Sequence, residues 1–260
     1  MKDAILEVPT PDGPMDIFVA YPEQDGPFPP IILYMDFWGM REELYDLARM
    51  VASVGYYCVV PDLYHRKGKR LAREWRNEKG EMISYIKLDE ATQKIAVEPQ
   101  QGWTDEQAMR DTAALFAFFD SRPDMVQAGG VGCFGYCMGG RLALRAAALF
   151  PQRIKAAASM HGTNLASDEP TSPHLGASKI TGELYFGFAE HDPWASIPMI
   201  KRLEEELKKN KVKFAHAIHK GALHGYALPQ RDIFHKQGYF RDWEMIFAMF
   251  NRQIPAYSKE

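Results

Sequence analysis

Cysteine is scarce in this chain, which has only three cysteines in 260 residues. A small, odd number of cysteines, with no leader-like apolar stretch ahead of them, argues against a fold held together by disulfides. Cys58 and Cys133 stand inside apolar, strand-like runs and are expected to be buried and unreactive. Cys137 differs from both, because it stands between glycines in the stretch "GYCMGG".

The chain also lacks an excess of positive charge and any long hydrophobic run. Its formal net charge is −3, so the basic surface that nucleic-acid binding needs is not expected. No stretch reaches the roughly 20 apolar residues of a membrane span. The charged residues Asp3 and Glu7 interrupt the N-terminal stretch, which therefore does not look like a signal peptide. We therefore expect a cytoplasmic protein with neither a nucleic acid nor a membrane as its partner.

What the chain does contain is an alternation of strand-like and helix-like segments. The expected strands are 4–10, 15–22, 30–36, 56–62, 129–135, 154–162, 182–192 and 212–221, and the expected helices are 41–55, 104–123, 138–151, 198–211 and 239–253. Apolar strands that alternate with amphipathic helices predict an α/β fold with a mostly parallel central sheet and helices on both faces.

The length and composition fit one large domain over residues 1–260, because 46% of the residues are hydrophobic. The segment 65–105 is polar and irregular over most of its length and matches no core element. We expect this segment to be a lid-like excursion over one edge of the domain.

Reactive side chains follow several of the expected strands. In open parallel sheets, ligands bind beyond the carboxyl ends of the strands. Asp36, Cys137, Asp192 and His224 each come just after a strand-like run. The last three occur in the order nucleophile, acid, histidine, which is the chain order of the α/β-hydrolase fold.

The stretch "GYCMGG" matches a nucleophile elbow with cysteine in the place of serine. The glycines two residues either side of Cys137 are explained by steric crowding in a strained strand-to-helix turn. The same turn places Cys137 at a helix N-terminus, where the helix dipole favours a thiolate. The alternative interpretation is a small, buried core cysteine.

The expected roles follow from the chemistry of acyl transfer. Cys137 attacks an acyl carbon, His224 takes up and returns the proton, and Asp192 holds the imidazole in place. The oxyanion requires two preorganised donors, which we expect to be the backbone N–H groups of Met138 and Phe37. Competing assignments are Asp168 or Glu190 as the acid and His216 or His219 as the histidine.

The motifs "GYCMGGR", "AEHDPW" and "HGY" together resemble the dienelactone hydrolase family, which are α/β-hydrolases with a cysteine nucleophile. The resemblance runs from about Met15 to Phe250. It implies hydrolysis of lactones or small carboxylic esters, of the carboxymethylenebutenolidase type, through a thioester acyl-enzyme. It implies no cofactor, and a small lactone or ester as the molecule bound.

The resemblance also suggests residues around the nucleophile. In the family an acidic residue after the strand, typically glutamate, contacts the resting thiol, and here that position is Asp36. Family members bind a substrate carboxylate with an arginine shortly after the histidine, and the first arginine after His224 is Arg231. From their places beside the reactive groups, Trp38, Tyr136 and Trp194 are candidates for lining a substrate pocket, with plain packing as the alternative. Arg141 and Arg231 are candidates for binding a substrate anion, with a solvated arginine or a structural salt bridge as the alternative.

Other functions stay open at this point. Within the enzyme class, the alternative is a broad-specificity carboxylesterase or thioesterase, and outside it a non-catalytic binding protein on the same fold. Ligands for zinc are present, namely His161, His191, Asp192, His219 and His224. Their spacing matches no compact metal motif, so we predict no metal. The oligomeric state is not predicted.

Overall fold

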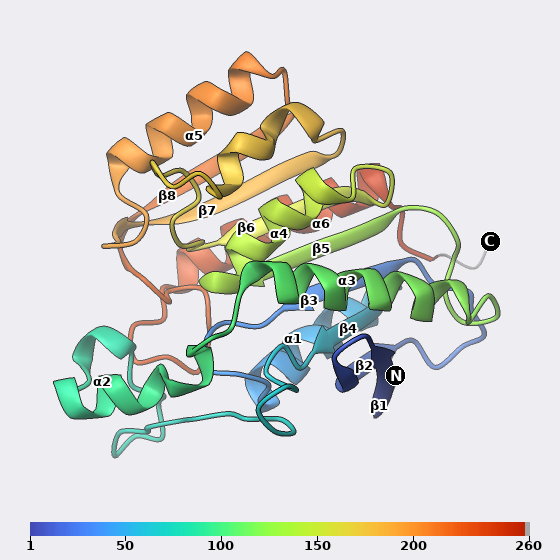
Figure 1. Ribbon diagram of the computed structural model, residues 1–260, viewed down its shortest axis with the longest axis horizontal. Helices are drawn as coiled ribbons and strands as arrows, with labels where there is room; N and C mark the ends of the chain where they lie inside the picture. Colours follow the sequence, from blue (N-terminus) through green and yellow to red (C-terminus); the bar gives the residue numbers. More distant parts are fainter. Residues whose placement is uncertain (258–260) are drawn as a thin grey trace.

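The computed structural model describes residues 1–257, and within them an eight-stranded sheet forms the centre of the molecule (Figure 1). Its strands are β1 (Lys2–Thr10), β2 (Gly13–Tyr21), β3 (Pro30–Tyr34), β4 (Tyr57–Pro61), β5 (Val131–Tyr136), β6 (Ile154–Met160), β7 (Glu183–His191) and β8 (Phe214–Leu223). They are arranged in the order β1-β2-β4-β3-β5-β6-β7-β8.

The pairing confirms the predicted mostly parallel sheet. All pairs from β4 to β8 are parallel, whereas β1, β2 and β4 pair antiparallel. β1 and β2 form an antiparallel hairpin, with Thr10 opposite Gly13 at its turn. β3, β4 and β5 are buried along their whole length, as strands with helices on both faces must be.

The principal helices lie on both faces of this sheet, as Figure 1 shows. They are α1 (Glu42–Ser53), α3 (Asp105–Asp120), α4 (Met138–Leu149), α5 (Ile197–Lys209) and α6 (Lys236–Gln253). α4 packs on β5 and β6 from one face with α3 beside it, and α1 and α6 cover the other face. None of the helices in residues 1–257 has the length and apolar character needed to cross a membrane.

The segment between β4 and α3 contains more regular structure than the sequence indicates. It holds η1 (Tyr85–Lys87), α2 (Glu90–Ala96) and η2 (Glu98–Gln100). The side chain of Asp89 caps α2 by accepting a hydrogen bond from the Thr92 N–H group. A helix this short shows no clear hydrophobic period, which is why the polar segment is expected to be irregular. A further short helix, η3 (Pro173–Lys179), precedes β7 and has no counterpart among the expected elements.

This excursion is fastened to the loop that follows β8. Met82 forms an isolated bridge with Arg231, and the Ser84 hydroxyl donates to Asp232 Oδ1 at 2.5 Å. Lys87 pairs with the same carboxylate at 2.9 Å. The loops after β3, β5, β7 and β8 lie at the same edge of the sheet, so the excursion is held beside the site that they form.

Candidate active site

Cys137 occupies a strained turn between β5 and α4. Its backbone has φ 55° and ψ −118°, and its N–H group donates to the Met160 carbonyl at 3.1 Å. A Cβ atom on Gly135 would collide with the Gly139 carbonyl, and one on Gly139 with the Tyr34 carbonyl. The turn therefore admits only glycine at both places. It leaves the Cys137 side chain partly exposed at the start of a helix.

The predicted acid and histidine come together beside this turn. Asp192 Oδ2 lies 2.7 Å from Nδ1 of His224, and both side chains are buried. Asp192 Oδ1 accepts the Trp194 N–H group at 2.9 Å, which fixes the orientation of the carboxylate. The Trp194 ring packs edge-on against the His224 ring, with 4.6 Å between their centroids. Asp192 thus holds one nitrogen of the imidazole, and the other, Nε2, is left for a reacting group.

The charge state of His224 depends on both neighbours. Burial lowers the pKa of His224, but the Cys137 sulfur and Asp192 together raise it to about 10. Nε2 of His224 is buried and has no hydrogen-bond partner within residues 1–257. The geometry therefore favours an imidazolium beside the sulfur and leaves Nε2 available for proton transfer.

Two backbone N–H groups near Cys137 are free to bind an anion. In the described part of the chain, neither the Phe37 nor the Met138 N–H group donates to a protein acceptor. Both residues contact Tyr64, whose hydroxyl donates to the Phe37 carbonyl at 2.9 Å and lies 3.8 Å from the Met138 sulfur. Tyr64 thereby ties the two segments together, a role that nothing in its sequence context indicates.

Asp36 is bound by arginines. Its Oδ1 atom accepts from Arg41 Nη1 at 2.6 Å and from the Trp38 N–H group at 3.2 Å. Its Oδ2 atom accepts from Arg231 Nη2 at 2.7 Å and from Arg41 Nη2 at 3.1 Å. No hydrogen bond joins Asp36 to Cys137 among the described residues, although both line the same pocket. The family resemblance implies a contact between Asp36 and the thiol, and in the structure this short carboxylate is bound by the guanidinium groups of Arg41 and Arg231.

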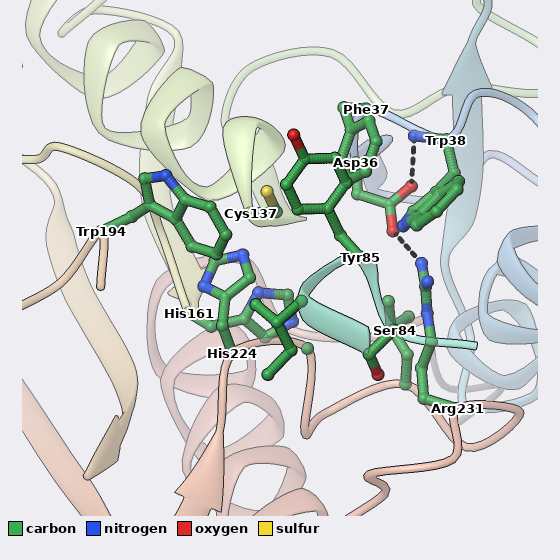
Figure 2. Close-up of a pocket in the computed structure, with 13 residues that line it drawn as sticks. Asp36, Phe37, Trp38, Ser84, Tyr85, Cys137, His161, Trp194, His224 and Arg231 are labelled. Carbon is green, nitrogen blue, oxygen red and sulfur yellow. Dashed lines mark hydrogen bonds and ion pairs between the residues drawn. The ribbon is translucent and has the colours of Figure 1, made fainter. Parts of the chain in front are cut away.

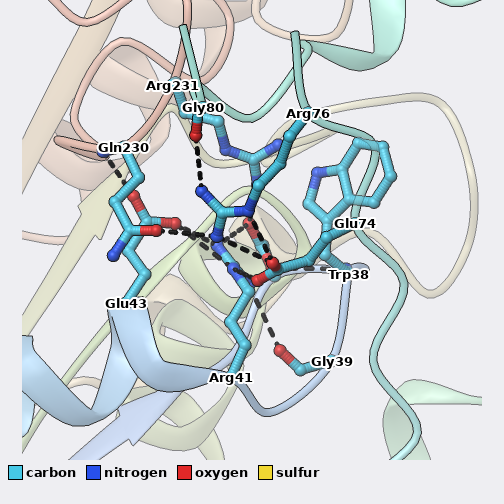
Figure 3. A network of polar contacts seen from close by, with 10 residues as sticks. Trp38, Gly39, Arg41, Glu43, Glu74, Arg76, Gly80, Gln230 and Arg231 are labelled. Atoms are coloured by element: carbon cyan, nitrogen blue, oxygen red, sulfur yellow. Dashed lines mark hydrogen bonds and ion pairs between the residues drawn. The ribbon is translucent and has the colours of Figure 1, made fainter. Parts of the chain in front are cut away.

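Arg41 also binds a second carboxylate, that of Glu43, as Figure 3 shows. Glu43 Oε2 accepts from Arg41 at 2.7 Å, and its Oε1 accepts the Gln230 N–H group at 2.8 Å. The two arginines and two carboxylates balance in charge. Burial disfavours the charged form of Arg41, but the carboxylates of Asp36 and Glu43 outweigh this effect and raise its pKa. For Arg231 burial is the larger effect, and it lowers the pKa. The sequence does not predict Arg41 and Glu43 as site residues, because charged residues at the start of an amphipathic helix usually lie on its exposed face.

Two cavities meet at Cys137 and His224. The larger has a volume of about 350 Å³ and includes Gln100, Trp103, Arg141 and Asn164 in its lining. The smaller, shown in Figure 2, offers about 20 Å³ to a water-sized molecule. Tyr85 of the excursion lines both cavities, and its ring packs edge-on against Phe37 at 5.4 Å.

The substrate-binding candidates divide between these cavities. Arg141 lines the larger one, where its Nη2 atom pairs with Asp105 at 2.8 Å. Trp38 and Arg231 line the smaller one, with the guanidinium 5.0 Å from the indole ring centre. Trp194 borders both, and Tyr136 borders neither. Side chains alternate along a strand, so Tyr136 points into the interior although it precedes Cys137.

The other cysteines and histidines form no further centre within residues 1–257. Cys58 and Cys133 are buried as expected, and burial raises the pKa of both thiols. In the same residues no group of three His, Cys, Asp or Glu side chains is placed to hold a metal ion. Of the residues considered as zinc ligands, His161 lies against His224, with 4.8 Å between the ring centroids.

Comparison with known proteins points to one family. The profile of the dienelactone hydrolase family matches residues 15–254. A Synechocystis protein named as a carboxymethylenebutenolidase is 24% identical over 259 residues, which covers 98% of each chain. A Methylorubrum extorquens protein of the same name is 27% identical over 204 residues, covering 75% of this chain and 63% of that protein.

Solved structures agree on the fold. A Klebsiella pneumoniae protein named as a dienelactone hydrolase superposes with a TM-score of 0.80 at 21% identity, covering 96% of this chain and 98% of that one. A dienelactone-hydrolase-like promiscuous phosphotriesterase from metagenomic libraries gives a TM-score of 0.74 at 18% identity, covering 97% and 99%. At these identities the likeness establishes the architecture and leaves the substrate open.

Proposed function

The chain belongs to the dienelactone hydrolase family and is a hydrolase, and from that membership we propose that it cleaves lactones or small carboxylic esters through a thioester on Cys137. The observation that carries the proposal is the 2.7 Å contact between Asp192 and His224 beside a cysteine held in a strained elbow. Acid, base and nucleophile in this arrangement are the components of covalent acyl transfer.

Acylation begins with the sulfur as a thiolate beside the His224 imidazolium. The thiolate attacks the acyl carbon, and the oxyanion is stabilised by the N–H groups of Met138 and Phe37. Removing one such donor typically costs about 10²–10³ in turnover. His224 then donates its proton to the departing oxygen, which leaves a thioester on Cys137 and a neutral imidazole. Asp192 keeps that imidazole oriented throughout.

The larger cavity supports a small, partly polar substrate. Its volume of about 350 Å³ is more than enough to admit a molecule of lactone size, and aromatic rings and polar groups line it together. Arg141 and Asn164 supply hydrogen-bond donors for substrate oxygens, and Trp103 supplies an apolar wall. The curated relatives are named as carboxymethylenebutenolidases, which favours an enol-lactone as the substrate class.

Arg231 and Asp36 are expected to bind a substrate carboxylate and the thiol, but in the structure they bind each other. Arg231 is bound to Asp36 in the lining of the smaller cavity, which has room for about one water-sized molecule, so its binding of a substrate carboxylate stays a prediction. The contact between Asp36 and the thiol likewise stays a prediction, since the carboxylate would have to give up an arginine to make it.

The test is esterase activity with and without a modified nucleophile. A chromogenic acetate ester and an enol-lactone are given to the native protein, to the protein alkylated with iodoacetamide, and to the Cys137→Ala variant. We expect activity to disappear in step with alkylation of Cys137. The Cys133→Ala variant is the matched control, because Cys133 is buried and should leave activity intact. Full activity after stoichiometric alkylation of Cys137 would rule out the mechanism.

A broad-specificity carboxylesterase or thioesterase is the second candidate. The observation that favours it is the larger cavity, which exceeds what a single small ring fills. A panel of enol-lactones, aliphatic esters and thioesters separates the two, since a lactonase should prefer the ring substrates by kcat/KM. Inactivity on the whole panel would favour a non-catalytic binding protein.

A further inference from the structure

His161 is held in a strained backbone conformation next to the nucleophile elbow. It follows β6 with φ 38°, a region that residues other than glycine rarely occupy. Its N–H group donates to the Gly187 carbonyl at 2.8 Å, and the preceding residue, Met160, accepts the N–H group of Cys137. Two adjacent parallel strands therefore end in strained residues that face the same site. Backbone strain of this kind is concentrated at functional positions.

The His161 side chain is buried without any partner for its polar atoms. It is 1% exposed, and neither Nδ1 nor Nε2 has a hydrogen-bond partner in the described residues. Leaving a buried polar group without a hydrogen-bond partner is destabilising. Its ring packs edge-on against His224, 4.8 Å between centroids, and lies near Tyr226 at 5.7 Å. Packing alone would be served as well by an apolar ring, so the two nitrogens call for an explanation.

Those nitrogens belong to the lining of the smaller cavity. His161, His224 and Cys137 border it together (Figure 2), and it offers about 20 Å³ to a water-sized molecule. A bound water requires at least about 10–15 Å³ of such volume and two to four polar partners. Nε2 of His224 and a nitrogen of His161 are both buried and unpaired, and they supply two partners. The cavity is thus the right size for one water and too small for an acyl group.

The two histidines differ in their affinity for protons. Burial, with help from His224 and Arg231, holds the pKa of His161 well below its ordinary range. His161 is therefore a neutral imidazole with one N–H group and one lone pair. Burial opposes a charge on His224, but its contact with Asp192 raises its pKa and does not depend on the state of the sulfur. Of these two neighbours, His224 is the one that accepts a proton, while His161 stays neutral and makes hydrogen bonds.

We propose that the smaller cavity binds the water that hydrolyses the acyl-enzyme, and that His161 holds this water in line with the thioester. The inference rests on the proposed function, because it concerns the second half of the same reaction. The water donates one hydrogen bond to Nε2 of His224 and the other to the unprotonated nitrogen of His161. These two bonds leave an oxygen lone pair to attack the thioester carbon.

The step balances without any further reactant. The water oxygen forms a bond to the thioester carbon while one of its protons passes to Nε2 of His224. The carbon–sulfur bond then breaks, and the sulfur of Cys137 leaves with the electron pair. The products are the carboxylic acid, a thiolate and an imidazolium, and the last two are the state from which acylation starts.

The test separates acylation from deacylation in His161→Phe and His161→Asn. Phe keeps the ring and removes both nitrogens, and Asn is the polar residue best suited to positive φ. Each variant is mixed with a chromogenic acetate ester, and the burst and the steady-state rates are recorded by stopped flow. We expect the burst to keep its rate and amplitude while the steady-state rate falls by about 100-fold. Mass spectrometry should show acetyl-Cys137 accumulating.

A second nucleophile and a control variant distinguish loss of the bound water from general damage to the site. Hydroxylamine attacks the thioester from the larger cavity without needing the bound water, so it should restore turnover in both variants. His216→Phe is the control, because His216 pairs with Glu204 away from the site and should leave both rates unchanged. A role of His161 in structure alone would slow the burst as much as the steady state.

The outcomes separate this inference from the function on which it rests. An acetyl group that never appears on Cys137 of the native protein overturns the proposed function and the inference together. An acetyl group that forms normally and is lost equally fast from the native protein and both variants overturns the inference alone. If His161→Phe does not fold, the same comparison is decided by His161→Asn.

Discussion

At the scale of single residues, the site depends on which partner each charged group has. Asp36 is 1% exposed and binds two arginines that are themselves buried. Removing one member of a buried ion pair leaves the other charge uncompensated, which is far more costly than breaking an exposed pair. The role of Asp36 can therefore be tested through stability and thiol reactivity together.

The Asp36→Asn substitution should destabilise the fold by about 3–5 kcal/mol, because Arg41 and Arg231 lose their shared counter-charge. Urea denaturation measures the loss. Asp12→Asn is the matched control, since Asp12 also accepts from two arginines but at the surface, and its midpoint should hardly move. If Asp36 acts only on the arginines, iodoacetamide will alkylate Cys137 at the native rate. A marked change in that rate would instead support the contact with the thiol that the family resemblance implies.

The raised pKa of His224 leads to a second prediction about a single residue. A histidine with a pKa of about 10 stays protonated across neutral pH, so the charge beside Cys137 is constant until pH approaches that value. The chemical shifts of the His224 ring, followed by NMR, should therefore vary little between pH 6 and 9. In Asp192→Asn, which removes one of the groups that raise this pKa, the ring should lose its proton at lower pH. A native ring that titrates between pH 6 and 8 would contradict the raised pKa.

At the scale of elements, α6 fixes the loop that carries His224. Asp242 of α6 is buried and accepts hydrogen bonds from the hydroxyls of Tyr185 on β7, at 2.8 Å, and Tyr226, at 2.5 Å. It also contacts Nε2 of His219 on β8 at 2.7 Å. One carboxylate thus joins α6, two strands and the loop that follows β8. Only Tyr226 among its partners lies on that loop, two residues after His224.

Replacing these tyrosines one at a time separates stability from catalysis. Tyr226→Phe and Tyr185→Phe each remove one hydrogen bond to a charged group, so both should cost about 1.5–3 kcal/mol in unfolding free energy. Only Tyr226→Phe should also lower kcat, because it frees the loop that positions His224. Thermal unfolding and steady-state kinetics are measured on both variants. Equal losses of kcat would show that the loop is held by other contacts.

The excursion is a second element whose position depends on one carboxylate. Burial raises the pKa of Asp232, but the hydrogen bonds from Ser84 and Lys87 outweigh it and hold that pKa below its ordinary value. For a depressed pKa, the stabilising effect is complete above the unfolded value of 3.8 and is lost as pH falls through the lower folded value. The contact should therefore persist through mildly acid solution.

Asp232→Asn should release η1 at neutral pH. We expect faster hydrogen exchange at residues 82–88 and a higher KM, since Tyr85 would no longer be held over both cavities. Asp89→Asn is the control within the excursion, because asparagine caps a helix as well as aspartate does. Unchanged exchange in Asp232→Asn would mean that the Met82–Arg231 bridge alone anchors the segment.

At the scale of the whole molecule, the sequence predicts the fold well because its signals are periodic and local. The apolar run 30–36 and the amphipathic run 41–55 contain β3 and α1, which lie within two residues of those ranges. The chain alone does not give the crossing order that puts β3 between β4 and β5. That order depends on contacts between segments distant in sequence, which no local pattern encodes.

The residues of the site also fall into two groups, those that the sequence identifies and those that only the folded chain reveals. Cys137, Asp192 and His224 can be picked out because each follows a recognisable strand and their order is characteristic. Arg41 cannot be identified in this way, because its contact with Asp36 exists only in the folded chain. His161 falls inside the expected strand 154–162, and only in the structure does β6 end one residue before it. The sequence therefore suggests at most a metal ligand at this position, because the strained backbone of His161 is invisible in the sequence.

The paired charges around Asp36 have a consequence for how substrates arrive. Arg41, Arg231, Asp36 and Glu43 sum to zero, so beyond a few ångströms their fields largely cancel. A negatively charged ester would gain little attraction from this part of the entrance while still in solution, and added salt would have little there to screen. Selection among charged and neutral esters then depends on how they fit after contact, and not on long-range attraction.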